Sequence, residues 1–334
     1  MKIESFPREL FLFRNNLCMF AQTQNELHNM KHMSILAVSL LALVACTPEK
    51  KQEADYSQYV NPMIGTDFTG NTYPGAQVPF GMVQLSPDNG LPGWDRISGY
   101  FYPDTTIAGF SHTHLSGTGA GDLYDISFMP VTRPYKEAPA PLGIYSTFSH
   151  NDEAASAGYY RVLLKDYNIN VELTATERCG IQRYTFPEAE ASVFLNLKKA
   201  MNWDFTLDSK IEVVDSTTIR GYRLSQGWSP LQHVYFETRF SKPFVACHMD
   251  TTSIVTKEKG WIGTAYVARF DFNTKKDEEI LVTTGISGVS MEGAGKNLRA
   301  EAPKDDFDYY QAQASANWNR QLSKIEVKSR NTDD

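Results

Sequence analysis

Cysteine is scarce in this chain, which has four in 334 residues. None of them forms a Cys-x-x-Cys pair, and this absence excludes a structural zinc site built on thiolates. Two of the four, Cys179 and Cys247, fall well inside the chain. The sequence leaves open whether these two form a disulfide or stay free thiols, because it fixes no distance between them.

Positive charge is also in short supply. The chain carries 32 Lys and Arg against 39 Asp and Glu, which gives a formal net charge of −7, and no basic face is visible. A nucleic-acid partner requires such a face, so this composition argues against that class of function. The sequence also lacks a repeat of about 20–50 residues. Its hydrophobic fraction of 42% is enough for one large β-domain or two smaller ones.

Long hydrophobic runs are missing near the N-terminus. The apolar stretch Ser34–Val44 is shorter than the roughly 18 residues that a membrane-spanning helix needs. It follows the short basic start Met30-Lys31-His32-Met33 and ends in Leu43-Val44-Ala45-Cys46, which matches a bacterial lipobox. The pattern predicts a lipoprotein signal peptide, with a buried hydrophobic helix as the alternative.

Three segments are therefore expected before the folded region. Residues 1–29 are interpreted as a misannotated extension, residues 30–45 as the signal peptide and residues 46–57 as a polar tether. Cys46 is expected to be diacylated, and two acyl chains hold a protein stably on a membrane. The expected location is the cell envelope, with a lipid anchor at the outer membrane that faces either the periplasm or the outside.

The pattern downstream is that of strands. From Tyr59 to Asp125, six prolines punctuate short apolar runs, which indicates strands joined by long loops. Regular alternation of apolar and polar residues then begins near Gly158 and marks the segments 170–186, 192–197, 211–222, 234–240, 261–272 and 279–290. Many short strands of this kind predict an all-β fold, a large antiparallel β-sandwich over residues 58–303.

A helix is expected to follow the sandwich. Asp305 or Asp306 provides an N-cap, and apolar residues recur at helical spacing from Phe307 to Leu322. This helix, within a predicted linker over residues 304–334, has an apolar stripe that we expect to need cover from another domain.

Several segments together resemble the N-terminal domain of glycoside hydrolase family 92, the calcium-dependent exo-acting α-mannosidases. The resemblance rests on their order and spacing, and they are Tyr59–Thr66, Tyr73–Ala76, Pro79–Asp88, Gly99-Tyr100, Gly109–Asp125, Val289–Glu301 and Asn317–Asn319. It implies a galactose-mutarotase-like supersandwich, connected by helices to a C-terminal α/α toroid.

The resemblance also implies a mechanism and a division of labour. In this family an acid protonates the leaving oxygen and a base activates water, with inversion, and the two carboxyls lie roughly 6.5–9.5 Å apart. Those residues and most calcium ligands belong to the toroid, before which this chain ends. No Asp or Glu is therefore nominated as catalytic here. Calcium is expected as a cofactor and mannose-containing glycans as partners.

The function that follows is the carbohydrate-binding half of an inverting α-mannosidase of the α-1,2 type. It acts on terminal mannose of N-glycans or mannans and is expected to be inactive alone. Two alternatives stay open: a stand-alone mannoside-binding lipoprotein, and an enzyme whose catalytic half is a separate polypeptide.

Within this resemblance, Trp94, Asp95 and Arg96 are the best substrate-binding candidates. Trp94 lies in a loop between glycine, proline and polar residues, where it can stack on a pyranose face, and its two neighbours can hydrogen-bond vicinal hydroxyls. The alternative is that Trp94 packs on its own sheet, as Trp228, Trp261 and Trp318 are expected to pack in the core or an interface.

The block from Gly109 to Asp125 supplies three further candidates. His112 and His114 lie two residues apart, so a strand would place both on one face, and Asp122 follows a run of glycines. These side chains can brace the loop through hydrogen bonds, contact the sugar, or form a transition-metal site together. The His-x-His pair alone does not decide between the three.

Overall fold

The computed structural model describes residues 54–140, 142–198, 202–256, 261–327 and 329. The chain divides into two compact units, Met1–Ala54 and Asp55–Asp334, and all elements named below belong to the second. The predicted extension, signal peptide and lipidation site at Cys46 lie outside the described residues. Within the described part, no helix is long and apolar enough to cross a membrane.

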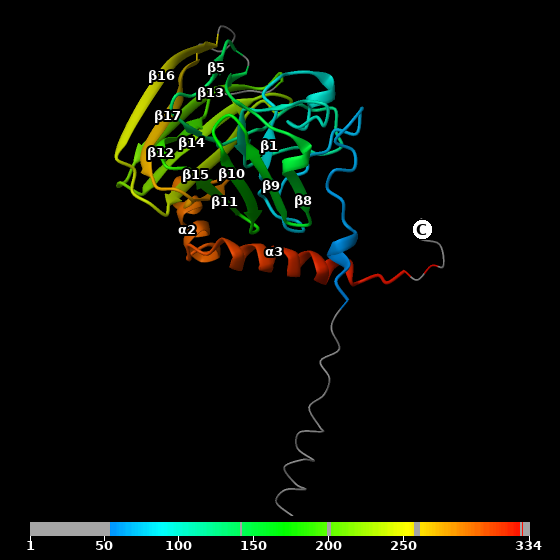
Figure 1. The fold of residues 1–334 in the computed structure, drawn as a ribbon. Coiled ribbons are helices and arrows are strands. Elements are labelled where there is room, and N and C mark those ends of the chain that lie inside the picture. Colours follow the sequence, from blue (N-terminus) through cyan, green and yellow to red (C-terminus); the bar gives the residue numbers. More distant parts are fainter. Residues whose placement is uncertain (1–53, 141, 199–201, 257–260, 328, 330–334) are drawn as a thin grey trace, which may run out of the picture. The chain divides into compact units, whose positions relative to one another are not determined.

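The second unit is built on two antiparallel sheets (Figure 1). The six-stranded sheet has the order β1 (Ser86–Asp88), β3 (Gly109–Ser111), β4 (Ser127–Thr132), β12 (Ala189–Asn196), β17 (Trp261–Thr274), β16 (Ala246–Thr256). The eight-stranded sheet has the order β13 (Phe205–Val213), β14 (Thr218–Gln226), β15 (Gln232–Phe240), β18 (Glu278–Ser287), β11 (Cys179–Phe186), β10 (Ile169–Ala175), β9 (Tyr159–Leu164), β8 (Glu153–Ser156).

Smaller elements complete the unit. Two short antiparallel pairs join β2 (Thr106–Ile107) to β7 (Ser146–Thr147) and β5 (Glu137–Ala138) to β6 (Gly143–Ile144). Three 3-10 turns are η1 (Tyr56–Tyr59), η2 (Trp94–Arg96) and η3 (His150–Asp152). The predicted all-β antiparallel sandwich is thus confirmed.

The main core lies between the two sheets. Phe128 of the six-stranded sheet meets Phe240 of the eight-stranded sheet edge to face, with ring centroids 6.4 Å apart, and Phe240 also contacts Phe270. Along β10 the side chains of Val171 and Leu173 are fully buried, while Asn170 and Glu172, which precede them, are half-buried. Burial of this apolar surface is the main term that stabilises the fold, and the period of two that produces it is visible in the sequence.

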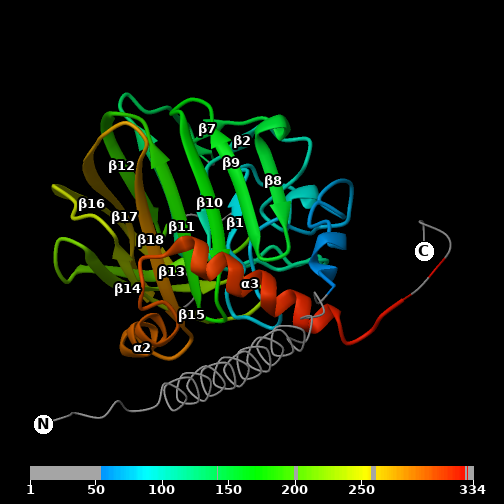
Figure 2. The ribbon, with the colours of Figure 1, turned by 60° about the horizontal axis from the view of Figure 1, so that its bottom comes forward.

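Two helices cover the outer face of the eight-stranded sheet (Figure 2). Helix α2 (Met291–Glu301) is capped by Ser290, and α3 (Phe307–Leu322) is capped by Asp306, whose carboxylate accepts from the Tyr309 N–H at 3.0 Å. The helix 307–322 and its cap are as predicted. The expectation that its apolar stripe needs another domain is wrong, because Phe307, Tyr310 and Ala314 are buried against the sandwich.

Other local predictions also change. The alternating segment 170–186 is a hairpin of β10 and β11 rather than one strand, and α2 occupies a segment for which the sequence predicted no helix. Cys179 is buried and Cys247 is half-buried, and both are free thiols. They lie on β11 and β16, in different sheets. The disulfide alternative is therefore excluded.

Gly285 lets α2 approach β18 closely, which gives a test of this packing. A Cβ at Gly285 would lie 2.6 Å from the Ala294 carbonyl oxygen and 2.8 Å from the Leu298 Cβ. We expect Gly285→Ala to lower the free energy of unfolding by about 1–3 kcal/mol, because the helix must move outward. Denaturant titration measures this.

The matched control is Gly288→Ala, three residues further on. The nearest atom to its Cβ, the Met82 Cε, is 3.7 Å away, so little change in stability is expected there. Equal effects at the two glycines would contradict the packing argument.

Candidate functional site

The predicted site residues gather at one end of the sandwich, where β14 ends and β15 begins. The turn η2, the segment before β13 and the loop ahead of β4 meet there. One hydrogen bond joins Gly93 to Asn202, and another joins Trp228 to Asp122. Segments far apart in the sequence therefore form one surface.

Trp94 is exposed rather than packed on its own sheet. Its exposed fraction is 60%, and its ring lies beside that of Trp203, which is 44% exposed. The ring centroids are 6.4 Å apart and the planes are inclined by 28°, within the range of offset-stacked aromatic pairs. Sequence reasoning missed Trp203. Its signal is an aromatic residue between Asn202 and Asp204, outside the alternating strand pattern.

The side chains of Asp95 and Arg96 differ in whether protein groups already bind them. The Arg96 guanidinium donates to Asp104 at 2.6 Å and 2.5 Å and lies over the Phe101 ring, 4.8 Å from its centroid. The hydrogen bond to Asp104 raises the pKa of Arg96. Asp95 is exposed, and its carboxylate accepts no hydrogen bond from the residues that the structure describes. Asp95 is thus the freer of the two to meet a ligand.

The two histidines are buried and brace the loop. The His112 Nδ1 lies 2.7 Å from the Ile126 carbonyl oxygen, and the imidazole is completely enclosed. Burial lowers the pKa of His112 to about 4, so the ring is neutral near pH 7 and Nδ1–H donates. The His114 ring lies 2.7 Å from the Gln84 carbonyl oxygen and 2.8 Å from the Asp88 carboxylate.

Asp122 is buried as well, and it holds a turn. One carboxylate oxygen accepts from the backbone N–H of Trp228 at 2.7 Å, from that of Ser229 at 3.3 Å and from the Gln232 amide at 2.8 Å. The turn between β14 and β15 presents Trp228 with an exposed fraction of 83%. This exposure excludes the core position predicted for Trp228 as one of two alternatives, and the interface alternative stays a prediction. The Trp261 side chain lies outside the described residues, and Trp318 is half-buried.

No metal site emerges from these residues. Among the side chains that the structure describes, no group of three or more His, Cys, Asp or Glu is arranged to hold a metal ion. The transition-metal alternative for His112, His114 and Asp122 therefore fails, because each bonds to different protein groups. The same donor set does not fit calcium, whose coordination requires six to eight oxygen ligands.

A buried ionic cluster lies beneath the exposed loops. The guanidinium of Arg223, on β14, donates to Asp125 at 2.7 Å, to Asp204 at 2.9 Å and to the Thr206 hydroxyl at 2.9 Å. The three charged side chains are completely buried. Burial raises the pKa of Asp204 to about 6, against the opposing effect of Arg223. Sequence reasoning did not single out Arg223.

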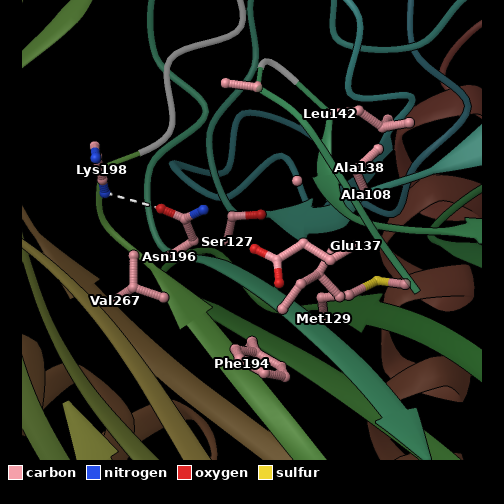
Figure 3. Close-up of a pocket in the computed structure, with 13 residues that line it drawn as sticks. Ala108, Ser127, Met129, Glu137, Ala138, Leu142, Phe194, Asn196, Lys198 and Val267 are labelled. Carbon is pink, nitrogen blue, oxygen red and sulfur yellow. Dashed lines mark hydrogen bonds between the residues drawn. The ribbon is translucent and has the colours of Figure 1, made fainter. Parts of the chain in front are cut away.

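A cavity of about 450 Å³ lies elsewhere, between the β5–β6 pair and the six-stranded sheet (Figure 3). Its wall combines apolar side chains such as Met129 and Phe194 with the polar Glu137, Asn196 and Lys198. The Glu137 carboxylate points into it. None of the six predicted substrate-binding residues lines this cavity, so it is separate from the candidate site.

Comparison with protein families identifies the class of this chain. Residues 59–287 match the glycosyl hydrolase family 92 N-terminal domain, and residues 293–334 match the glycosyl hydrolase family 92 catalytic domain. The architecture is thus that of a glycosidase's N-terminal β-sandwich. The chain belongs to glycosyl hydrolase family 92. The predicted domain bounds 58–303 and 304–334 stay a prediction.

Solved structures and a curated relative agree with this. An α-mannosidase of the family from Bacteroides thetaiotaomicron is 37% identical, with a TM-score of 0.76, over 83% of this chain and 39% of its own. An inverting mannosidase of the same family and organism is 26% identical, with a TM-score of 0.68, over 84% and 38%. An "uncharacterized secreted glycosidase" of Arthroderma benhamiae is 23% identical over 90% of this chain and 42% of its own. The chain spans about two fifths of these relatives.

Arg223→Ala tests the buried cluster. It leaves two buried carboxylates without their cation, so we expect the free energy of unfolding to fall by about 3–5 kcal/mol. Arg220→Ala, on the same strand but paired with the half-exposed Glu212, is the control and costs at most about 1 kcal/mol. Chemical denaturation compares the two. A loss no larger than that of the control would show that the cluster does not stabilise this end.

His112 gives a pH test. The unfolded imidazole titrates near pH 6.5 and the folded one near 4, so the unfolded state binds more protons between these values. This group therefore makes the free energy of unfolding rise with pH there, by up to about 1.4 kcal/mol per unit. Asp204, with its raised pKa, contributes the opposite slope.

The difference between wild type and His112→Asn isolates the contribution of His112. We expect the variant to lose the rising component between pH 4 and 6.5, as measured by denaturation at several pH values. An unchanged profile in His112→Asn would refute the assignment.

Proposed function

We propose that this chain is the sugar-binding half of an exo-acting, inverting α-mannosidase of the α-1,2 type. Its substrate is the terminal mannose of N-glycans or mannans. The observation that carries the proposal is the exposed Trp94 beside Trp203 and next to the unengaged Asp95. An aromatic face takes the apolar side of a pyranose, and a carboxylate accepts from its hydroxyls. The sugar class is taken from the mannosidases of the same family to which the chain is similar.

We further propose that the chain does not hydrolyse mannosides by itself. Inverting catalysis needs an acid and a base roughly 6.5–9.5 Å apart, with room for water between them. Of the four acidic residues that we describe near the candidate surface, Asp122, Asp125 and Asp204 are buried and bonded to protein groups, and Asp95 alone is exposed, so they do not form such a pair. We place the catalytic pair and the calcium ligands that the family implies outside the described residues.

The N-terminal segment supports an envelope location. We propose that residues 30–45 are removed and that Cys46 is diacylated, which anchors the protein to the outer membrane. A lipid anchor keeps a glycan-binding surface at the envelope, where polymeric mannosides arrive from outside the cell.

A stand-alone mannoside-binding lipoprotein is the second candidate, and one observation favours it. Helix α3 buries its apolar stripe on the sandwich of this same chain, so that stripe needs no second domain. The two proposals differ in affinity. A complete binding site holds a disaccharide at micromolar concentration, whereas one side of a cleft binds far more weakly because it buries less of the ligand.

The deciding experiment incubates the purified chain with α-1,2-, α-1,3- and α-1,6-linked mannobiose, with calcium present and then chelated. We expect no mannose release above the protein-free blank under any condition, and no micromolar binding by calorimetry. Release of mannose would overturn the inactivity of the chain. Saturable micromolar binding that Trp94→Ala abolishes would favour the stand-alone binder.

A further inference from the structure

The Asn202 side chain forms hydrogen bonds with both ends of the turn that carries Trp94. The Gly93 N–H donates to Asn202 Oδ1 at 3.0 Å, and Asn202 Nδ2 donates to the Arg96 carbonyl oxygen at 3.3 Å. The N-cap residue Gly93 has a φ of 155° and no side chain with which to cap the turn. One amide side chain from a distant segment therefore performs the capping that the turn lacks locally.

The glycines that precede Asp122 fit against the same two residues. A Cβ at Gly119 would lie 3.2 Å from the Trp94 ring, and a Cβ at Gly121 would lie 2.7 Å from the Asn202 Cβ. The glycine-rich loop thus passes directly along the indole and the amide. Larger side chains at these positions would displace one or the other.

The residues after Asn202 complete the arrangement. Trp203 places its ring beside Trp94, and Asp204 is fixed in the interior by Arg223. These three consecutive residues have different roles. Asn202 holds the Trp94 turn, Trp203 supplies a second ring, and Asp204 anchors the segment in the interior. Packing each against a rigid partner limits the freedom of both rings.

We infer that Asn202 is a positioning residue and that Trp203 joins Trp94 in a single two-ring surface for the apolar face of a hexopyranose. This inference rests on the proposed function and extends it to two residues. Two rings held side by side contact more of a sugar's C–H surface than one ring does. Asp95, next to Trp94 on the same turn, provides an acceptor for hydroxyls at the edge of the sugar.

The test follows the indole N–H signals in ¹⁵N-labelled chain, which has five tryptophans that Trp→Phe variants assign. Titration with methyl α-mannoside at millimolar concentration is expected to shift the Trp94 and Trp203 signals together. The Trp318 signal is the internal control, because its N–H is bonded to the Gln77 carbonyl oxygen at 2.7 Å. It should not move.

Variants separate positioning from folding. Asn202→Ala is expected to move both indole signals without ligand and to weaken the mannoside response about tenfold. Asn202→Asp keeps the acceptor for the Gly93 N–H and should restore part of the response. Trp203→Ala should move the Trp94 signal and weaken the response. A wild-type Trp318 signal in each variant shows that the fold is kept.

The outcomes distinguish this inference from the proposed function. If mannoside shifts Trp94 but not Trp203, or if Asn202→Ala titrates as wild type, the inference is overturned while sugar binding stands. If mannoside shifts no indole signal in the wild-type chain, the sugar-binding proposal itself fails. A weakened response of the Trp94 and Trp203 signals to mannoside in Asn202→Ala, with partial recovery in Asn202→Asp, supports the positioning role.

Discussion

The ion pairs of Arg223 with Asp125 and Asp204 are the constraint on which the functional end of this domain depends. Taking three charges out of water is costly, and the cluster is tolerated because each carboxylate meets the guanidinium directly. The three residues come from separate parts of the chain: the end of the glycine-rich loop, the segment before β13 and strand β14. Their pairing fixes how these parts lie relative to one another.

The buried Arg223 cluster determines how the exposed loops are arranged. Asp125 also accepts from the Thr113 hydroxyl at 2.7 Å, which ties the histidine segment to the cluster. Asp204 directly follows Trp203, so the position of that ring is set one residue away from a buried anchor. The loops at this end are long, but the interior holds each of them at a charged or polar side chain. A loop-built surface can therefore keep a fixed geometry.

Sequence reasoning recovers features that arise from local rules. The alternation along β10 indicates which face of the strand is buried. Asp306 and the helical spacing from Phe307 to Leu322 indicate a capped helix. Both patterns can be recognised because they depend on neighbours within a few residues. It failed where contacts are distant. Arg223 lies on the buried face of β14, in phase with Ile219, but its carboxylate partners are 19 and 98 positions away, and Asn202 and Gly93 are 109 positions apart. Nothing in the sequence near either residue indicates that they meet.

The histidine block shows why dense chemistry in a sequence is a poor guide to ligand contact. His112, His114 and Asp122 attract notice because they combine protonatable and charged side chains, yet all three are buried and bonded to the protein. Such groups must be paired when they leave water, so a buried loop that needs bracing accumulates them. The surface that meets solvent is built instead from tryptophans and one free carboxylate. In this domain Asp122 holds the turn that leaves Trp228 exposed, and Asn202 holds the turn that leaves Trp94 exposed, so buried polar side chains position the rings that a ligand can reach.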